Sequence, residues 1–557
     1  MKNANSLTKG QPFEEGGAVP AFVLILISTA AAVALFFFFT AGIPLIQAGL
    51  LADFGEGKKR YVKAARLSVL LLGTGLMLLR WKCPRIFDRL WLVRAARRTL
   101  SFPLGTNIAV LFFIYGLTLS AVSVLRHAAL ETRAFDLGIF AQAVWTTLHG
   151  SFLYSSIKEG ICLMGDHVSP LLALLTAPYA VWPDPRTLLI LQAFAAAACL
   201  FPLAQFVEEK FLDKKTALVF ALMYFFFMPT RAAVHEDFHP EVLVEPLMIW
   251  AFLWLERGRM KLFLLALAVI LAAKENMSGI VFAFGVYAGV FKKKRLLGLA
   301  LAVFSVAYLF FCTRWLVPHL SGKPYLYTGF YSHLAGADAA GLMGMLADPE
   351  RWEYLLKVYL PFLYLPFLDP PTLLLTLPVL VQNLLSRNGV ARSFNYHYMT
   401  GLTPFLFISS AAALLHLRTR FAGVRKHFDI FLAVLLWTAM LRAGAPEYFY
   451  GWESARHITA RTAMIRSEMA KIPGTAVLLT HNNLVPQAVN RFGVYQFDYA
   501  PLPAKAQAAV KRKAGYVAMD ARFWEPDTPP LESEKRALLA GGYRVIFEKD
   551  DFLILQK

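Results

Sequence analysis

The stretch VLVEPLMIWAFLWLERGRMKLFLLALAVILAAKEN, residues 242–276, contains two apolar runs joined by a short basic loop. The runs, 242–255 and 262–273, predict two helices in a nonpolar environment. The loop ERGRMK (256–261) is rich in Arg and Lys, which membrane proteins concentrate in their cytoplasmic loops. The stretch therefore predicts a membrane hairpin whose turn faces the cytoplasm. Its outer ends are HEDFHPE (235–241) and KEN (274–276).

The composition extends this prediction to the whole chain. Of its 557 residues, 57% are hydrophobic and only 17% are charged, whereas soluble domains carry about 25% charged residues. The mean hydropathy is +0.51. The net charge of +19 is concentrated in short basic loops, so it indicates membrane topology rather than a nucleic-acid partner. Four widely separated cysteines predict neither a disulfide framework nor a cysteine-based metal site.

Three further basic loops, at 80–98, 291–295 and 418–427, are assigned to the cytoplasm by the same rule. Segment 168–183 is short and contains prolines, so it predicts an interfacial or re-entrant helix. Residues 20–42 predict a retained helix rather than a cleaved signal peptide, and 67–79 leaves one or two helices before residue 100. Spanning helices that alternate sides are predicted near 103–125, 187–206, 216–229, 242–255, 262–273, 279–291, 296–317, 354–368, 371–385, 401–417 and 428–442.

The predicted fold class is an all-α polytopic membrane protein of about 12–13 transmembrane helices, with a small C-terminal extracytoplasmic α/β domain. Three parts are expected: N-terminal membrane segments and a basic cytoplasmic loop (1–100), a transmembrane core with polar outer loops (101–442), and the α/β domain (443–557). Strand-like segments such as TAVLLT and GYVAMD, separated by helical patterns, support the last part. The predicted location is the inner (cytoplasmic) membrane.

HEDFHPE begins with the H-E-x-x-H pattern of zinc proteases. That pattern needs His235 and His239 on one face of a continuous helix, so that both imidazoles reach one metal ion. Pro240 disfavours the helical conformation at His239, and the helix would have to end there. A membrane zinc protease is therefore a weak alternative.

The polar stretches of the chain all fall on the predicted outer face, where ionisable residues beside a membrane are candidate functional groups. Asp136 is the candidate general base, although an Asp at this position is also a favoured N-cap for a helix beginning at Leu137. The run that follows Asp136 predicts an amphipathic interfacial helix. Carboxylates and imidazoles in the neighbouring loops are candidate ligands for a divalent cation. These metal candidates are Asp166, His167, His235, Glu236, Asp237, His239 and Glu241.

A second set of residues on this face is assigned to substrate binding. Lys274, Arg231 and Arg392 are candidates for holding an anionic phosphate. Glu275 accompanies Lys274, and a local interfacial ion pair is an equal alternative for these two residues. Tyr396 and His397 are further candidates, although an aromatic membrane belt also explains their stretch.

The order of the stretches FDLGIFAQAVW, GDHVSP, HEDFHPE, KEN and NYHY resembles a bacterial membrane-protein family called DUF2079. The tail LLTHNNLVPQAVNR … GYVAMD resembles that family's terminal domain. The family is similar to GT-C-type glycosyltransferases, which use polyprenyl-phosphate donors. The resemblance implies that Asp136 is the catalytic base, with a second acidic site at Glu236 or Asp237. The chain departs from the family pattern at Asn276, where an acid is expected, and at Gln487, where a His is expected.

The resulting expectation is a membrane glycosyltransferase that moves a sugar from a polyprenyl-phosphate donor to an envelope acceptor on the extracytoplasmic face. Its expected partners are the lipid carrier and a glycan, lipid or protein acceptor, and a divalent metal cation is a possible cofactor. A non-catalytic envelope protein that binds lipid or glycan is the alternative. A transporter is disfavoured because such proteins place ionisable residues near the bilayer midplane within repeated halves.

Overall fold

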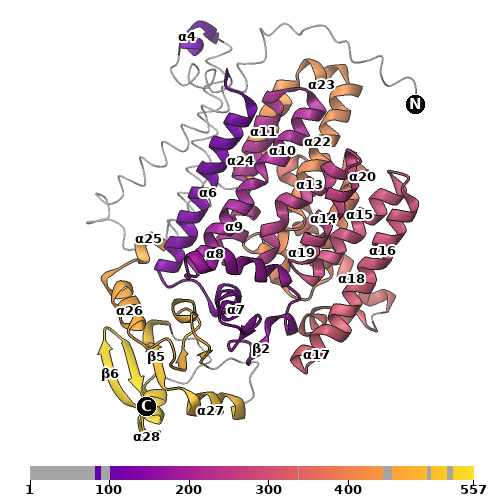
Figure 1. Ribbon diagram of the computed structural model, residues 1–557. Helices are drawn as coiled ribbons and strands as arrows, with labels where there is room; N and C mark the ends of the chain where they lie inside the picture. The colour runs from indigo at the N-terminus through magenta and orange to yellow at the C-terminus, as the bar shows by residue number, and fades with distance from the viewer. Residues whose placement is uncertain (1–81, 90–100, 337, 443–453, 498–503, 524–530) are drawn as a thin grey trace.

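The computed structural model describes residues 82–89, 101–336, 338–442, 454–497, 504–523 and 531–557. A large helical unit is followed by a small C-terminal domain, which lies beyond the Ala128 end of α6 (Leu104–Ala128) (Figure 1). This arrangement confirms the prediction of a helical unit and a terminal α/β domain. The helices predicted at 20–42 and 67–79 lie outside the described residues.

Within the described residues, three helical stretches are long and apolar enough to cross a membrane: Leu104–Ala128, Arg186–Phe211 and Arg295–Ser321. A fourth candidate is the pair α11 (Lys214–Phe226) and α12 (Met228–His235), which is bent by 42°. Shorter apolar helices make up much of the remaining unit, so the number of spans stays a prediction.

The helical unit also contains many shorter helices, most of which overlap the predicted segments, whereas some, such as Ala339–Ala347, were not predicted. They are α4 (Pro84–Arg89), α7 (Ile139–Leu148), α8 (Thr176–Val181), α9 (Arg186–Ala198), α10 (Leu200–Phe211), α13 (Glu245–Glu256), α14 (Met260–Leu271), α15 (Ser278–Val290), α16 (Arg295–Phe310), α17 (Val317–Ser321), α18 (Ala339–Ala347), α19 (Pro349–Tyr359), α20 (Pro370–Leu373), α21 (Leu377–Leu385), α22 (Thr403–Arg420), α23 (Ala422–Lys426) and α24 (Phe428–Arg442).

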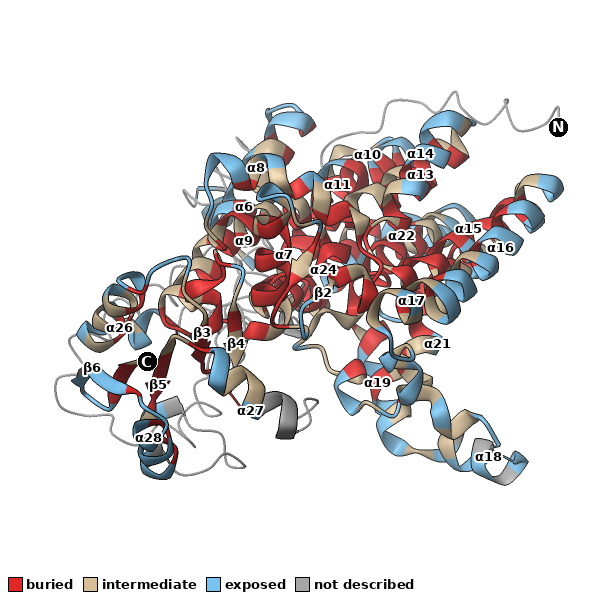
Figure 2. Ribbon diagram, turned by 60° about the horizontal axis from the view of Figure 1, so that its bottom comes forward, coloured by how far each residue is buried: buried red, intermediate tan, exposed pale blue. Residues whose placement is uncertain are grey.

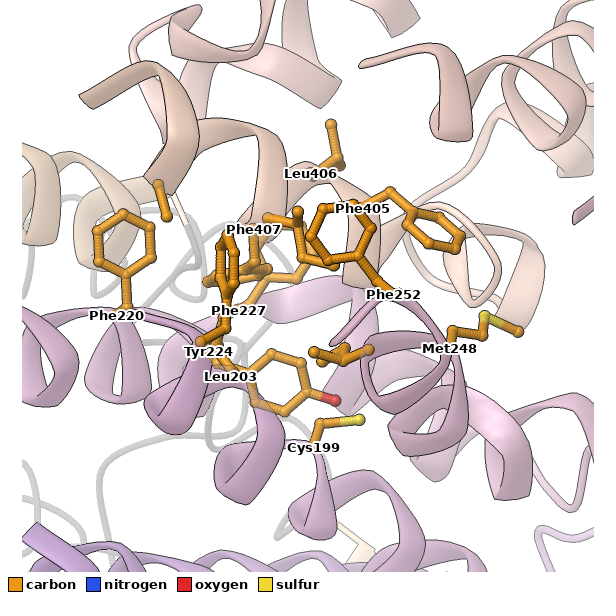
Figure 3. Close-up of a cluster of buried hydrophobic side chains, with 14 of the residues drawn as sticks. Cys199, Leu203, Phe220, Tyr224, Phe227, Met248, Phe252, Phe405, Leu406 and Phe407 are labelled. Atoms are coloured by element: carbon orange, nitrogen blue, oxygen red, sulfur yellow. The ribbon is translucent and has the colours of Figure 1, made fainter. Parts of the chain in front are cut away.

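Aromatic side chains occupy the centre of the helical unit (Figure 3). The ring of Phe407 on α22 lies 5.4 Å from the rings of both Tyr224 and Phe227, which flank the break between α11 and α12. Edge-to-face pairs of this kind add about 0.5–1.5 kcal/mol each to the packing. Buried residues line the facing sides of the central helices, whereas α16 is largely exposed (Figure 2). Its exposed apolar side chains suit contact with lipid.

Small residues allow α15 and α16 to approach closely. Gly285 and Gly289 lie four residues apart on α15 and face Gly298 of α16. A Cβ atom at Gly298 would lie 2.6 Å from the carbonyl oxygen of Gly285, which the packing does not permit. This small-xxx-small pattern is typical of helix pairs in membranes.

The C-terminal domain contains a five-stranded sheet of order β4-β3-β5-β7-β6. The first three strands are parallel, and the last two are antiparallel to their neighbours. The strands are β3 (Leu478–Thr480), β4 (Val494–Gln496), β5 (Tyr516–Asp520), β6 (Arg544–Lys549) and β7 (Phe552–Gln556), and the helices are α25 (Ser454–His457), α26 (Ala460–Ala470), α27 (Ala504–Lys513) and α28 (Leu531–Ala540). These strands confirm the predicted ones.

Segment 168–183 and α7 were both predicted from the sequence to lie at the membrane interface. Segment 168–183 forms two short helices, η3 (Pro170–Leu175) and α8, as expected for the predicted interfacial or re-entrant segment, and it is shorter than the candidate spans. α7 follows Asp136 as predicted, but it is buried on nearly all sides, so it does not have the exposed apolar face of the predicted amphipathic interfacial helix. α7 belongs to the same apolar cluster as residues of the C-terminal domain, so its apolar side chains pack against protein.

Candidate functional site

Asp136 lies in η1 (Ala134–Gly138), a short irregular turn between α6 and α7. Its backbone has φ 74° and ψ −93°, a conformation that is strained for a residue with a side chain. The N-cap of α7 is Gly138, so Asp136 does not take the capping role. The side chain of Asp136 is 36% exposed. The turn therefore holds a partly open carboxylate in a conformation that the surrounding structure must impose.

The loop after α12 carries the acidic and histidine residues of HEDFHPE. α12 ends at His235, and His239 is extended, with φ −134° and ψ 118°. A 3-10 helix, η4 (Pro240–Val244), begins at the proline. His235 and His239 therefore do not share a continuous helix, as the residue before a proline is expected to be extended.

His239 joins this loop to Asp136. Its Nε2 lies 3.6 Å from Oδ2 of Asp136 and 3.8 Å from Oε2 of Glu236. The imidazole of His397, in η12 (His397–Met399), stacks on that of His239 with ring centroids 3.7 Å apart. The backbone N–H of His397 donates to Oε2 of Glu236 at 3.1 Å, and Nδ1 lies 3.0 Å from the same oxygen. Three segments distant in sequence thus meet around one imidazole.

Glu241 and Lys274 complete what we call the charged cluster: Asp136, Glu236, His239, Glu241, Lys274 and His397. Nζ of Lys274 lies 3.3 Å from Oε1 of Glu241, which is 3.8 Å from Nε2 of His397. Burial by itself would raise the pKa of Glu241, but the charges of Lys274, His397 and His239 lower it to about 2. The carboxylate of Glu241 is therefore ionised at neutral pH.

The charges of the cluster also control the protonation of the two histidines. Burial favours neutral His239, but the nearby carboxylates of Asp136, Glu236 and Glu241 raise its pKa to about 9. The pKa of Asp136 lies well below its usual value because the charge of the nearby His239 outweighs the effect of burial. Water reaches Asp136 and screens part of this attraction. Burial and the charge of His239 both lower the pKa of His397. His239 is therefore protonated at neutral pH, and its charge disfavours a second charge on His397.

Glu236, His239 and His397 are arranged so that they could hold a metal ion. One potential ligand atom from each lies within 4.8 Å of the other two. Both ring nitrogens of His239 are enclosed and lack a hydrogen-bond partner among the described residues. Two imidazoles and one carboxylate suit zinc, manganese or a similar cation, and three protein ligands leave a coordination position open. The donor set therefore fits a divalent metal, provided that His239 loses its proton on binding.

Two other metal candidates belong to a separate group. Nδ1 of His167 lies 2.9 Å from Oε1 of Glu275, and the backbone N–H of Val168 donates to Oε2 at 2.8 Å. The hydroxyl of Tyr325 donates to Oε1 of Glu275 at 2.5 Å. Oδ2 of Asp166 lies 3.1 Å from Nζ of Lys158. These contacts tie the loop around residue 166 to the segment after α17.

Asp237 also forms its ion pair outside the charged cluster, near the end of α6. Its side chain pairs with Arg126 of α6 and accepts a 3.0 Å hydrogen bond from the backbone N–H of Arg133. His235 lies at the end of α12 and is not a member of the metal triad. The structure thus brings together Glu236 and His239 from the predicted metal ligands, and it adds His397, which was predicted to bind substrate.

The remaining substrate candidates are dispersed. A guanidinium nitrogen of Arg231 lies 3.4 Å from the carbonyl oxygen of Phe226. Arg392 donates to the carbonyl oxygen of Ser386 at 2.8 Å. Tyr396 is half-buried, with its ring 6.5 Å from that of Tyr398. Lys274 is the predicted cation that joins the charged cluster.

Three positioning residues were missed by the sequence reasoning. The side chain of Gln192 on α9 donates to the carbonyl oxygen of Asp237 at 2.6 Å and accepts a hydrogen bond from the backbone N–H of His239. Arg126 pairs with Asp237, and Asn482 in the C-terminal domain accepts from the backbone N–H of Ala134 at 2.8 Å. Arg126 offered a signal, because a basic residue at the predicted outer end of a span opposes the positive-inside rule.

Comparisons with known proteins agree with the fold. A family model described as "Predicted membrane protein (DUF2079)" matches residues 126–554. A crystal structure of ArnT from Cupriavidus metallidurans bound to undecaprenyl phosphate is similar with a TM-score of 0.51 and 12% identity, covering 80% of this chain and 97% of that one. Apo ArnT from the same organism gives a TM-score of 0.49 and 12% identity, covering 81% and 98%. Among curated proteins, none matches the sequence.

The likeness to ArnT bound to undecaprenyl phosphate confirms the predicted GT-C-like fold. At this identity the likeness concerns the fold alone.

Proposed function

The chain belongs to the DUF2079 family of predicted membrane proteins, and on that premise we propose that it is a GT-C-type glycosyltransferase. It would move a sugar from a polyprenyl-phosphate donor to an envelope acceptor on the extracytoplasmic face. The observation that carries this proposal is the strained, partly exposed Asp136 beside the buried charged cluster. Strained residues gather at active sites because the local cost is tolerated for function.

In the proposed reaction, a hydroxyl of the acceptor attacks the anomeric carbon of the sugar. The bond between that carbon and the phosphate oxygen breaks, and the polyprenyl phosphate leaves with the bonding electrons. A carboxylate oxygen of Asp136 accepts the hydroxyl proton. Because the hydroxyl becomes acidic as the new bond forms, a carboxylate of low pKa can accept its proton late in the reaction. Asp136 is ionised at neutral pH and needs no prior deprotonation.

Lys274 is proposed to neutralise the phosphate of the leaving carrier. Its ammonium group is half-buried, and the charges of Glu241, Glu275 and Asp136 outweigh burial and hold its pKa above the usual value. It is therefore a permanent cation beside the proposed base. A phosphate oxygen would share this ammonium group with Glu241, since an ammonium group has three donors.

Glu236, His239 and His397 are proposed to hold a divalent cation, which would supply positive charge for the phosphate group. Gln192 and Arg126 keep the loop of Asp237 and His239 in place through the hydrogen bonds described above. The fold of a protein whose crystals contain undecaprenyl phosphate supports a lipid-phosphate substrate of this class.

The test is sugar transfer by the purified full-length protein from a panel of polyprenyl-phosphate-linked sugars, measured as released polyprenyl phosphate and glycosylated envelope material. The proposal predicts turnover with at least one donor. Saturable donor binding without release of the carrier, across the panel and with crude envelope acceptors, would favour the non-catalytic binding protein.

A further inference from the structure

A cavity of about 230 Å³ lies at the junction of the helical unit and the C-terminal domain, and it is lined by no residue of the charged cluster. His127, Asp184 and Arg186 line it from the ends of α6 and α9, and Arg466, Gln487 and Arg491 line it from the C-terminal domain. Since water occupies about 30 Å³ per molecule in the liquid, the cavity has room for a small polar group such as a phosphate.

The polar lining of the cavity favours an anion. Three guanidinium groups face one carboxylate. Asp184 is already held by Arg186, whose Nε and Nη2 donate to its two oxygens at 2.7 Å. Nε of Arg491 donates to the carbonyl oxygen of Ala488 at 2.9 Å. Nε of Arg466 is enclosed and has no hydrogen-bond partner among the described residues. An enclosed charged donor without a partner is costly, and an anionic oxygen would remove that cost.

Exposed apolar residues beside the cavity indicate a membrane surface. The guanidinium carbon of Arg186 lies 5.0 Å from the ring of Trp182, which is 43% exposed. Val181 at the end of α8 is 88% exposed, and Leu174 in the preceding η3 is 69% exposed. Trp residues are enriched at membrane interfaces, and exposed apolar side chains next to a basic group suit the level of lipid headgroups. The wall at His127 belongs to the end of a predicted span.

The C-terminal domain forms hydrogen bonds to the part of the helical unit that lines the cavity. Asn490 donates to the carbonyl oxygen of Pro183 at 2.6 Å and accepts from the hydroxyl of Tyr179 at 2.9 Å. Gln487 donates to the carbonyl oxygen of His127 at 3.0 Å. The cavity wall η14 (Val485–Ala488) therefore joins the domain to the outer end of α6.

We propose that this cavity binds the phosphate group of a membrane lipid, with Arg466 as its main ligand and Arg186 as the second. Arginine holds phosphate oxygens through several directed hydrogen bonds. The bound headgroup would fasten the C-terminal domain to the helical unit at the membrane surface. This site goes beyond the transferase proposal and does not depend on it.

The test measures binding of dioleoyl phosphatidic acid to the full-length protein in dodecyl maltoside, by native mass spectrometry over a lipid titration. Arg466→Gln is expected to weaken binding by about tenfold, as for the loss of a charge-assisted hydrogen bond. Arg536→Gln is the control, because Arg536 lies exposed on α28 and outside the cavity. Dioleoylglycerol, which lacks the phosphate, should not bind at this site.

A competition experiment with inorganic phosphate shows whether the cavity binds a lipid headgroup or free phosphate. If inorganic phosphate competes with phosphatidic acid for the wild type, and this competition is lost in Arg466→Gln, the result supports the lipid site. Binding of inorganic phosphate without phosphatidic acid would overturn it, as would equal lipid affinity of wild type and Arg466→Gln. Gln487→Glu puts a negative charge in the same wall and should weaken lipid binding if Arg466→Gln fails to fold. Asp136→Asn should bind phosphatidic acid normally, which keeps this test separate from that of the transferase.

Discussion

Oδ1 of Asn482 accepts a 2.8 Å hydrogen bond from the backbone N–H of Ala134, although the two residues are 348 positions apart. Ala134 begins the strained turn that carries Asp136. A side chain of the C-terminal domain thus supports the turn of the proposed base. The sequence favoured a strand-end turn rich in Asn at Asn482, with a binding loop as the alternative, and predicted that the domain supplies no catalytic group.

Asn482→Ala is expected to lower kcat about fivefold to tenfold, because it removes one hydrogen bond worth about 1 kcal/mol from the turn. Asn482→Asp keeps the acceptor oxygen and should retain most of the activity. The measurement is turnover per folded molecule, with folding followed by size-exclusion chromatography. Equal activity of the alanine variant and the wild type would show that Asn482 does not support the turn of Asp136.

Asp136→Asn is expected to lower kcat by about 10²- to 10⁴-fold, the usual contribution of a general base. Asn matches Asp in size but does not accept a proton at neutral pH. Folding and donor binding should change little. Asp551→Asn, at an exposed residue of the C-terminal domain, is the matched control. If Asp136→Asn keeps most of the wild-type turnover, Asp136 is not the base.

The metal triad makes a prediction that does not require activity. The purified protein, loaded with Mn²⁺ or Zn²⁺ and desalted, should retain about one ion per chain by elemental mass spectrometry. Glu236→Gln and His397→Ala should each lower this retention at least about tenfold. His149→Ala serves as the control because His149 is exposed. Retention by both triad variants, or failure of the wild type to retain either ion, would contradict the assignment.

The contacts of Glu275 predict that the stability of the folded protein depends on pH. Burial favours its protonated form, but the charge and hydrogen bond of His167, with Lys274 and Tyr325, lower its pKa to about 2. Because this lies below the ordinary value of 4.5, the stabilisation is complete above pH 4.5 and is lost as the pH falls toward 2. The wild type should therefore exceed Glu275→Gln in stability by about 3 kcal/mol at pH 7, and the difference should shrink below pH 4.5.

Thermal unfolding in detergent at pH values between 7 and 3 measures this difference. Glu532→Gln is the control, since Glu532 is exposed on α28. A difference between wild type and Glu275→Gln that stays constant down to pH 3 would show that the carboxylate charge of Glu275 is not what stabilises the group.

The topology is tested by labelling single cysteines in a background that lacks the four native ones. Lys513→Cys in the C-terminal domain should react with an impermeant maleimide in spheroplasts. Lys294→Cys, in the basic loop before α16, should react only after lysis. Both positions are exposed, so access depends on the side of the membrane. Reversed labelling would overturn the topology drawn from the basic loops.

Local chemistry accounts for much of what the sequence predicted. The helices and strands were recognisable because the polarity of each segment follows its own environment and period. The end of the helical geometry before Pro240 was predictable for the same reason, since a proline restricts its neighbour directly. The candidate residues were predicted to share the outer face because charged loops indicate which side each helix end occupies.

The partners of the polar residues could not be predicted in this way. His397 was assigned to substrate, yet it lies beside Glu236, 161 positions away. Asp166 and His167 were grouped with the metal ligands, whereas His167 pairs with Glu275. All these residues lie on the same predicted face, and only the lateral packing of the helices separates one group from the other.

The sequence by itself thus predicted the membrane topology, the terminal α/β domain and Asp136 as the leading candidate, through polarity, periodicity and its resemblance to DUF2079. The tertiary structure decided that His239 meets Asp136, that Asn482 supports its turn, and that Arg466 and Arg186 line the same cavity. These contacts join segments far apart in the chain. Their geometry depends on how helices and domains pack, which no local stretch of residues encodes.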